Sequence, residues 1–382
     1  MVGSIVSRFL QKMAPAWFRR GARALKTHGR YRGLRLASVL LRPVLGDRAP
    51  LRGYEVDLAA YAKRTGAAYL PGSAAGLGVA VLPRGRVLFD YGVVSTPERR
   101  LVADVSPQMG LPPPAHDALA VPRLPPMTRF QGRLAVLSST AHQRYYHWMF
   151  DVLPRLELLR QTDLGIDAYL INTELGYQQD AVRHLAITPA ISPSSQTHIE
   201  ADELVVPTLT GDIGYPTRDA CDFLRRGFLP ATLPELQRRR LYISRRDARM
   251  RRVENEAEVI AALQPLGFET VELEGMAVMD QVMLFAAAEM IVGPHGAGFV
   301  NTVFSPSGSG ILEFWDDDDF SDSYELLARL RDMHYRRLRC RSVSPETHDL
   351  RVEVADMMEA VRLLAQQIGD GRIGESGPVG SA

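Results

Sequence analysis

"IVGPHGAGFVNTVFSP", residues 291–306, is the stretch that decides the fold of the second half of this 382-residue chain. A largely apolar run ends at Gly293, and the chain turns apolar again only at Phe299. Between them stand Pro294, His295, Gly296, Ala297 and Gly298. We interpret this pattern as a buried strand, a loop whose glycines let the backbone bend close to a ligand, and the start of a helix.

Such a loop has a chemical use. The first N–H groups of a helix have no partner within the helix, and the helix dipole is positive at that end. A strand, a glycine loop and a helix N-terminus together make an anion site, most often for phosphate. The spacing of the glycines fits neither G-x-G-x-x-G nor the P-loop pattern. A tight structural turn is the alternative.

The surrounding sequence alternates between short apolar runs and amphipathic segments. We expect strands at 241–244, 269–273, 290–292, 310–314 and 335–340, separated by helices at 255–263, 279–288, 298–304 and 324–331. This alternation predicts a parallel sheet covered on both faces. Ligands of such sheets bind beyond the carboxyl ends of the strands, so the residues after 243 and after 292 are the candidate site.

The stretch "LYISRRDARMRRVENEAEV", residues 241–259, supplies the second half of that site. The predicted strand delivers Ser244 and Arg245 to the edge of the sheet, and a guanidinium pairs with phosphate oxygens at any physiological pH. The neighbouring arginines, such as Arg246 and Arg251, are expected on a solvated loop. Two strand ends rich in cationic or N–H groups predict a diphosphate ligand.

A third stretch is "RYYHWMFDVLPRLELL", residues 144–159. On one helix His147, Asp151 and Arg155 would lie along one face, and Pro154 would kink the helix near Asp151. These groups suit acid–base chemistry. The alternative is a buried Asp–Arg pair that only holds the structure together.

The first half predicts strands as well. Val79–Leu82 and Arg86–Phe89 flank Pro83-Arg84-Gly85, which is typical of a β-hairpin.

Composition excludes several classes of protein. Hydrophobic residues make up 46% and charged residues 23%, as in ordinary globular proteins, and this length usually means two domains. With only two cysteines, a disulfide framework or a zinc site is not expected. Twelve Lys or Arg against one acid give residues 1–52 a net charge of +11. This arm predicts either an amphipathic segment on an anionic membrane or a solvated helix, and it lacks the features of a nucleic-acid-binding segment.

Two other signals are weaker. His295–Gly298 also fits the oxyanion loop of esterases, but no G-x-S-x-G motif accompanies it. The acidic run at 316–319 contains the D-x-D pattern of metal-dependent glycosyltransferases, and four consecutive acids more often form a solvated loop.

Taken together and in order, "YYHWMFDVLPRL", "YISRRDARMRRVENEAEV" and "VGPHGAGFVNTVFSPSGSGILEF" resemble glycosyltransferase family 61, including its bacterial capsular-polysaccharide members. The resemblance covers roughly residues 75–340. It implies an α/β fold of the GT-B type, with two Rossmann-like domains facing across a cleft, here preceded by the basic N-terminal helical arm. The implied domains are a basic arm (1–52), an acceptor-side domain (53–230), a nucleotide-sugar-binding domain (231–345), a C-terminal helix (346–368) and a disordered tail (369–382).

The resemblance also implies roles for residues. The donor diphosphate would be held by Ser244, Arg245, Gly293, His295, Gly296, Ala297 and Gly298. Glu313 would contact the nucleoside, Asp151 or His147 would be the catalytic base, and Tyr146 and Arg155 would lie on the acceptor side.

The expected function is an inverting glycosyltransferase that moves a sugar from a nucleoside diphosphate, UDP first among them, to a saccharide or lipid-linked saccharide. No metal or other cofactor is expected to be obligatory. The setting would be bacterial surface polysaccharide synthesis in the cytoplasm, with the enzyme peripheral on the inner membrane face. A non-catalytic nucleotide-sugar-binding or scaffold subunit of a polysaccharide assembly is the alternative.

Overall fold

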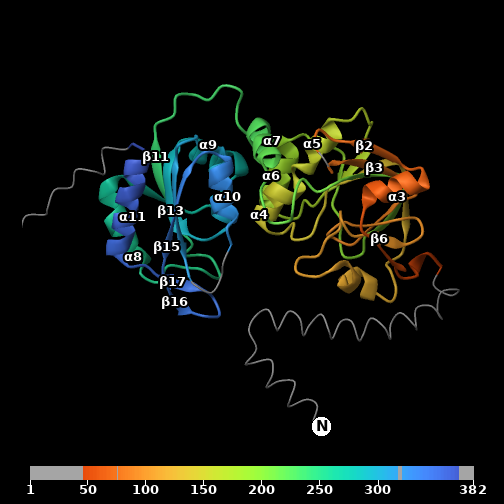
Figure 1. Ribbon diagram of the computed structural model, residues 1–382, viewed down its shortest axis with the longest axis horizontal. Coiled ribbons are helices and arrows are strands. Elements are labelled where there is room, and N and C mark those ends of the chain that lie inside the picture. The colour runs from red at the N-terminus through yellow and green to blue at the C-terminus, as the bar shows by residue number, and fades with distance from the viewer. Residues whose placement is uncertain (1–45, 75, 317–320, 370–382) are drawn as a thin grey trace, which may run out of the picture. The chain divides into compact units, whose positions relative to one another are not determined.

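A computed structural model describes residues 46–74, 76–316 and 321–369. The expectations for the arm at 1–52 and the tail at 369–382 therefore lie almost wholly outside the described residues. The described chain forms two compact α/β units (Figure 1). Unit 1 holds the residues up to His142 together with Arg155–Asn172 and Ile187–Leu209, and unit 2 holds Gln143–Pro154, Thr173–Ala186 and the residues from Thr210 onward.

Unit 1 is built around a mixed sheet. Its helices are η1 (Gly46–Arg48), α3 (Leu58–Thr65), η2 (Pro113–Ala115), η3 (Asp117–Ala120) and α5 (Arg155–Arg160). Its strands are β1 (Gly53–Glu55), β2 (Ala68–Pro71), β3 (Gly78–Pro83), β4 (Arg86–Leu88), β5 (Val93–Ser95), β6 (Arg100–Val102), β7 (Thr128–Val136), β8 (Ala168–Leu170), β9 (Ala190–Ile191) and β10 (His198–Pro207). The main strand order is β1-β6-β5-β4-β10-β7-β8-β9, and β3 also pairs with β10 and β2.

The predicted hairpin at Pro83-Arg84-Gly85 is wrong. Both β3 and β4 pair antiparallel with the same strand, β10, in one continuous register, so the chain runs straight on instead of turning back. Arg84 has a positive φ of 53°, so the backbone between β3 and β4 is irregular at this residue. Its N–H still donates to the carbonyl oxygen of Asp202 in β10, so the segment stays paired with that strand. The long partner strand decides this, because β10 offers enough backbone groups for both segments.

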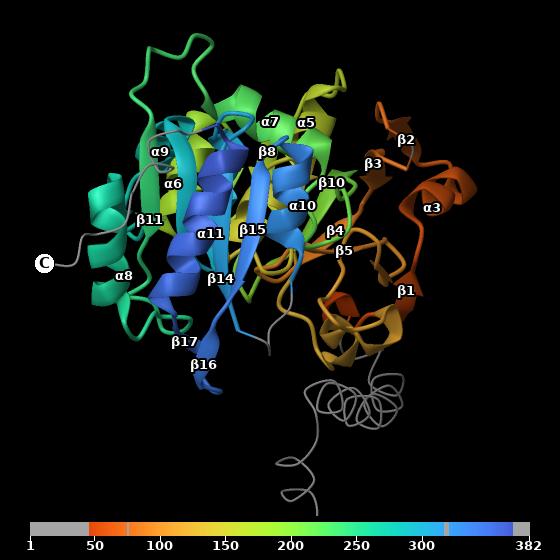
Figure 2. The same cartoon turned by 60° about the vertical axis from the view of Figure 1, so that its left-hand side comes forward.

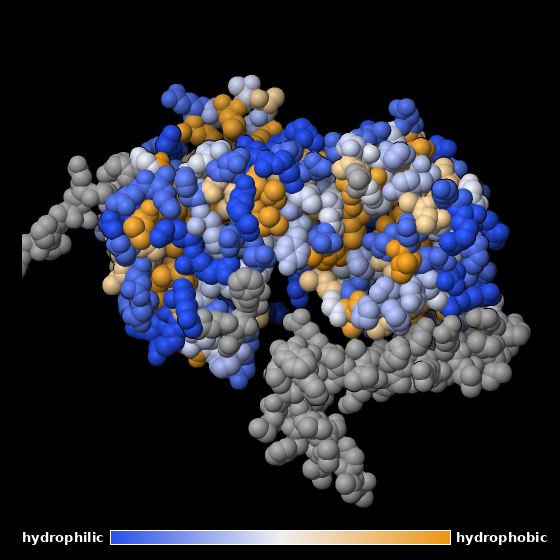
Figure 3. Space-filling model, in the orientation of Figure 1, coloured by the Kyte–Doolittle hydropathy of each residue, from blue (hydrophilic) through white to orange (hydrophobic). Residues whose placement is uncertain are grey.

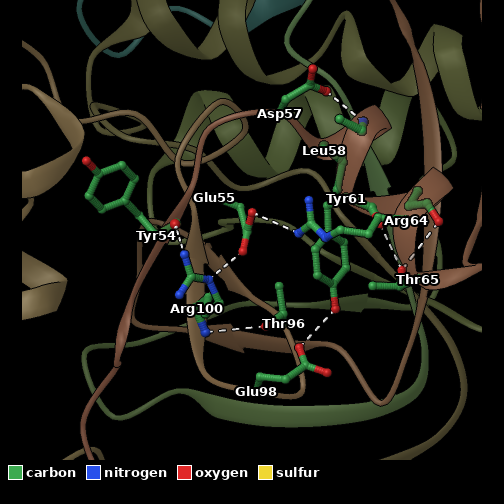
Figure 4. A network of polar contacts seen from close by, with 12 residues as sticks. Tyr54, Glu55, Asp57, Leu58, Tyr61, Arg64, Thr65, Thr96, Glu98 and Arg100 are labelled. Carbon is green, nitrogen blue, oxygen red and sulfur yellow. Dashed lines mark hydrogen bonds and ion pairs between the residues drawn. The ribbon is translucent and has the colours of Figure 1, made fainter.

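Polar contacts join β1, α3 and β6 at the edge of this sheet (Figure 4). Glu55 pairs with Arg100 of β6 and, at 3.0 Å, with Arg64 of α3. The Tyr61 hydroxyl donates to Glu98 Oε2 at 3.0 Å. Ion pairs that are partly open to water contribute little each, so this network orients the elements, and the buried clusters of apolar side chains beneath supply most of the stability.

Unit 2 contains a parallel sheet and most of the described helices. Its helices are α4 (Tyr145–His147), the π-helix η4 (Trp148–Val152), α6 (Gly176–His184), α7 (Arg218–Phe228), α8 (Glu256–Leu263), η5 (Gln264–Leu266), α9 (Val278–Ala286), the 3-10 helix η6 (Ala297–Phe304), α10 (Ser323–Leu330) and α11 (Val354–Gln367). Its strands are β11 (Arg239–Ile243), β12 (Phe268–Val271), β13 (Ala288–Pro294), β14 (Gly310–Trp315), β15 (His334–Arg339), β16 (Arg341–Ser344) and β17 (Asp349–Arg351).

This sheet confirms the predicted βα alternation. Its order is β12-β11-β13-β14-β15 and all its pairs are parallel. In unit 2, α8 and α11 cover one face and α9 and α10 the other (Figures 1 and 2). The strand β13 is buried along its whole length, as a strand covered on both faces must be. On α11 the buried residues Met357, Val361, Leu364 and Ala365 follow the helical period and pack on the sheet.

The surface of the described residues is mostly polar, with small apolar patches on the face shown in Figure 3. The most exposed large hydrophobic residues are scattered along the sequence: Val56, Met109, Tyr215, Leu233 and Met250. Among the described helices, none combines the length and the apolar character needed to span a bilayer.

Candidate functional site

The order of the strands in unit 2 gives the position of the site. Going out from β11, the chain first adds β12 on one side and then β13, β14 and β15 on the other. The loops that leave the carboxyl ends of β11 and β13 therefore separate in opposite directions and open a crevice, which is where ligands bind in such sheets. The stretches that begin at Ser244 and at His295 both start there.

The glycines of the loop are needed for close packing. A Cβ on Gly293 would come within 2.9 Å of the carbonyl oxygen of Ile243, and one on Gly298 within 2.9 Å of Leu273 Cδ1. Neither these two glycines nor Gly296 has a left-handed φ. The expectation that they let the backbone bend is therefore wrong, because their missing side chains make room for neighbouring atoms and not for an unusual conformation.

Gly296 makes room for Arg245. A Cβ at position 296 would lie 2.2 Å from Arg245 Nη1 and 2.8 Å from Cζ, so the guanidinium rests directly on the glycine. Nη2 donates to the carbonyl oxygen of Met250 at 3.1 Å, while the buried Nε–H has no acceptor among the described residues.

The charge of Arg245 is not neutralised within the part of the chain that the structure describes, where no carboxylate forms an ion pair with it. Burial lowers the pKa of its guanidinium, and the nearby cation Arg251 lowers it further. Because an arginine stays charged even so, Arg245 presents a partly buried positive charge, and a charge that is partly removed from water in this way favours binding of an anion.

A cavity of about 620 Å³ opens beside this arginine. Ser244, Arg245, Ala297 and Gly298 line it, so the structure brings these predicted phosphate ligands together. Tyr145, Tyr177 and the loop at 272–277 also line the cavity. His147, Asp151, His295 and Glu313 are not among its lining residues. In the residues described, no cluster of three or more His, Cys, Asp or Glu could hold a metal ion.

A chain of hydrogen bonds fixes the walls of the cavity to one another. The Tyr145 hydroxyl donates to Asn301 Oδ1 at 2.9 Å, and Asn301 Nδ2 donates to Gln281 Oε1 at 2.8 Å. Gln281 Nε2 in turn donates to the carbonyl oxygens of Leu273 and Met276, within the loop at 272–277. Since Asn301 and Gln281 are buried, these hydrogen bonds are shielded from water and tie the walls of the cavity to one another.

The second predicted motif forms a buried dyad. His147 Nδ1 lies 2.6 Å from Asp151 Oδ2, and Gly214 N–H approaches Asp151 Oδ1 at 3.4 Å. With its proton on Nδ1, the imidazole donates to the carboxylate, and Nε2 then carries a lone pair. Nε2 has no protein partner among the described residues. This arrangement is that of a histidine base oriented by a carboxylate.

Arg155 does not join that dyad, contrary to the expectation of one helical face. The helix changes to a π-helix at Trp148–Val152 and ends there, and a turn at 153–154 precedes α5, so the angular spacing of an α-helix is lost. Arg155 begins α5 in unit 1, is 0% exposed, and donates to the carbonyl oxygens of Leu137, Ser138 and Pro207. Its contacts are those of a structural residue.

Tyr146 does stay beside the dyad. Its ring lies edge-on to His147 with the centroids 5.4 Å apart, and its hydroxyl donates to the carbonyl oxygen of Gly214 at 2.9 Å. The carbonyl oxygen of Gly214 thus accepts a hydrogen bond from Tyr146, and its N–H donates one to Asp151. These two bonds tie both side chains to the same loop.

His295 and Glu313 form a second His–carboxylate pair. Glu313 Oε1 lies 2.5 Å from His295 Nδ1, and Oε2 accepts from the Tyr335 hydroxyl at 2.6 Å. Glu313 is 0% exposed. The expected contact of Glu313 with a nucleoside is therefore not supported, because both of its oxygens are occupied inside the protein. Its effect on a ligand would pass through His295.

Some residues of the site gave no signal in the sequence. Gln281 and Asn301 lie inside helical segments, where a polar residue is usually a surface position. Tyr177 follows a loop and belongs to a helix that comes from the first half of the chain. Only their burial and their contacts in the tertiary structure distinguish these residues from ordinary surface or core positions.

Of the acidic run at 316–319, the structure describes only Asp316. Asp316 is buried and its Oδ2 lies 2.9 Å from His348 Nδ1, while residues 317–319 of the D-x-D signal lie outside the described residues.

Known proteins match the stretch of sequence that carries these groups. Residues 145–312 match the sequence model of the family described as Glycosyltransferase 61. The chain is similar to the EGF domain-specific O-linked N-acetylglucosamine transferase of Drosophila melanogaster, with 32% identity over 116 residues, or 30% of this chain and 22% of that protein. It is also similar to the protein O-linked-mannose beta-1,4-N-acetylglucosaminyltransferase 2 of Pan troglodytes, with 36% identity over 98 residues, or 24% of this chain and 17% of that protein.

These matches span about a fifth of the length of the relatives. The matched segment at 145–312 contains the His147–Asp151 dyad, Arg245 and the Gly293–Gly298 loop. The part of this chain that carries the candidate site is thus similar to glycosyltransferases of family 61.

Proposed function

We propose that this protein is a glycosyltransferase that uses a nucleoside-diphosphate sugar as donor. The observation that carries the proposal is the cavity at the carboxyl ends of β11 and β13, where Arg245 presents a partly buried positive charge beside Ala297 and Gly298, with no ion pair to a carboxylate among the described residues. A guanidinium together with the first N–H groups of a helix suits the oxygens of a diphosphate.

In this reaction the acceptor hydroxyl oxygen forms a bond to the anomeric carbon while the bond from that carbon to the β-phosphate oxygen breaks. The acceptor proton passes to His147 Nε2, and Asp151 holds the imidazole in place. The nucleoside diphosphate leaves with the electron pair, and Arg245 and the start of η6 stabilise the charge that develops on it. The single displacement inverts the configuration at the anomeric carbon.

Further features of the proposal come from the family resemblance. We propose a GT-B type enzyme, with 53–230 on the acceptor side and 231–345 on the donor side, that needs no obligatory metal. UDP-sugars are the first donors to test, and a saccharide or lipid-linked saccharide is the acceptor. A role in bacterial surface polysaccharide synthesis, with the arm at 1–52 on the inner membrane face, completes the proposal.

The test is binding of UDP, GDP, CDP, dTDP and ADP to the full chain by isothermal titration calorimetry, with and without EDTA. One diphosphate should bind the wild type, and Arg245→Ala should lose most of that affinity while its melting temperature without ligand is kept. Arg249→Ala is the matched control, because Arg249 is exposed and is not among the residues lining the cavity. If none of the five binds, the proposal is wrong. If EDTA abolishes binding, its metal-independent part is wrong.

One observation favours the alternative of a non-catalytic nucleotide-sugar-binding subunit. His147 and Asp151 do not line the cavity, so a ligand could occupy it without meeting the base. Tight binding of a UDP-sugar with neither transfer to saccharide acceptors nor hydrolysis would support this alternative.

A further inference from the structure

Four aromatic rings form a continuous row in unit 2, and they join the two His–carboxylate pairs. The Tyr146 ring lies 5.7 Å from that of Tyr324, Tyr324 lies 5.3 Å from His295, and His295 lies 4.1 Å from Trp315, all as distances between centroids. At one end Tyr146 packs against His147. Tyr324 is therefore the ring between the base dyad and the glycine loop.

Tyr324 is held rigidly by that loop. Its ring also packs against Phe299 of η6, with the centroids 5.5 Å apart, and the residue is only 3% exposed. A buried tyrosine hydroxyl normally finds a hydrogen-bond partner. The Tyr324 hydroxyl has none among the described residues. The hydroxyl oxygen is also absent from the fully buried polar atoms without a partner in this part of the chain, so it keeps some contact with solvent and is accessible to a ligand that could accept its hydrogen bond.

The charges around Tyr324 indicate which kind of group would do so. The groups that act on its hydroxyl are Tyr146, Glu313, Arg245 and Arg251. Burial first, and then Tyr146 and Glu313, raise its pKa well above the ordinary value for tyrosine, so the hydroxyl stays protonated and keeps a hydrogen that it can donate to an anion. Arg245, which lines the proposed phosphate site, and Arg251 both add positive charge to the surroundings of the hydroxyl.

We propose that the Tyr324 hydroxyl donates a hydrogen bond to the β-phosphate of the bound donor, the phosphate that is bonded to the sugar. This inference rests on the proposed function. In a direct displacement the β-phosphate is the phosphate nearest to the reacting carbon and hence to the base. Tyr324 lies between the dyad and the loop, since its ring contacts those of Tyr146 and His295, whereas the cavity beside Arg245, which Tyr324 does not line, has room for the nucleoside.

The position of the bond gives a sharp test, because UMP lacks the β-phosphate. Calorimetry with UDP and with UMP, or with the corresponding pair for the base that binds, should show that Tyr324→Phe raises the Kd for UDP roughly tenfold to hundredfold. The Kd for UMP should change less than twofold. Tyr54→Phe serves as the control, since it removes a hydroxyl from a strand of unit 1.

The outcomes are distinguishable. If Tyr324→Phe binds UDP as tightly as the wild type while Arg245→Ala does not, the inference is wrong and the proposed function stands. If Tyr324→Phe loses UDP and UMP equally, the hydroxyl does not act on the β-phosphate and the inference is wrong. If no nucleoside diphosphate binds the wild type, the proposed function and this inference fall together. The melting temperature of Tyr324→Phe without ligand should equal that of the wild type, since no bond within the protein is lost.

Discussion

Adding one methyl group at Gly296 tests the phosphate site without touching any charged group. The backbone at Gly296 has a φ of 173°, which is extended and open to any residue, so alanine brings no backbone strain. Its Cβ would lie 2.2 Å from Arg245 Nη1, where ordinary contacts begin at 3.4 Å. The guanidinium must therefore retreat by about 1.2 Å, the difference between these two distances, because it is the flexible partner.

The size of the effect follows from the hydrogen bonds that this retreat breaks. A hydrogen bond to a charged group contributes about 1.5–3 kcal/mol, and 1.4 kcal/mol corresponds to a tenfold change in affinity. A displacement of more than 1 Å takes a donor out of hydrogen-bond range. We therefore expect Gly296→Ala to raise the Kd for the bound nucleoside diphosphate roughly tenfold to hundredfold and to leave the melting temperature without ligand almost unchanged.

The assay is calorimetric titration of the wild type, Gly296→Ala, Arg245→Ala and the double variant. Gly165→Ala is the matched control, because a Cβ at position 165 would meet no atom within 4 Å. If the methyl group acts through Arg245, its effect should disappear in the Arg245→Ala background. An equal loss of affinity in both backgrounds would refute the reasoning, and so would an unchanged Kd in the single variant.

Three further predictions concern the dyads and the pH dependence of stability. His147→Gln and Asp151→Asn should each slow sugar transfer by about 100-fold or more while the Kd for the diphosphate is kept, as single-turnover kinetics beside calorimetry would show; full activity in both would return the dyad to a structural role. Glu313→Gln should lower the free energy of unfolding by about 1–3 kcal/mol in urea titrations, because a buried charged acceptor for His295 and Tyr335 is lost; an unchanged urea midpoint would contradict this. Burial tends to raise the pKa of Glu200, but hydrogen bonds from Arg86 and Arg84 outweigh it and lower the pKa. The ionised carboxylate thus stabilises the fold above about pH 4.5, and this stabilisation is lost as the pH falls below that value toward the lowered pKa. The difference in urea midpoint between the wild type and Glu200→Gln should therefore disappear at acidic pH.

The local sequence was sufficient for the parallel sheet of unit 2. Buried parallel strands need continuous apolar runs and the helices between them need an apolar stripe, and both patterns are visible in residues 239–339 without any long-range information. The placement of Ser244 and Arg245 at a strand end follows from the same pattern, because a strand of known length fixes where its loop begins. The same local reading failed for β3 and β4, since the choice of β10 as common partner depends on residues more than a hundred positions away.

By itself, then, the sequence determined the βα alternation, the loop at Gly293–Gly298, the position of Arg245, and the family resemblance carried by its motifs. Tertiary structure decided what each group does there. It seats Arg245 on Gly296, occupies both oxygens of Glu313, places Arg155 in the other unit, and packs the ring of Tyr324 against His295 of the loop. The physical reason is that strand and helix periods are set by neighbours in the chain, whereas burial, hydrogen-bond partners and local charge are set by groups brought together from distant segments.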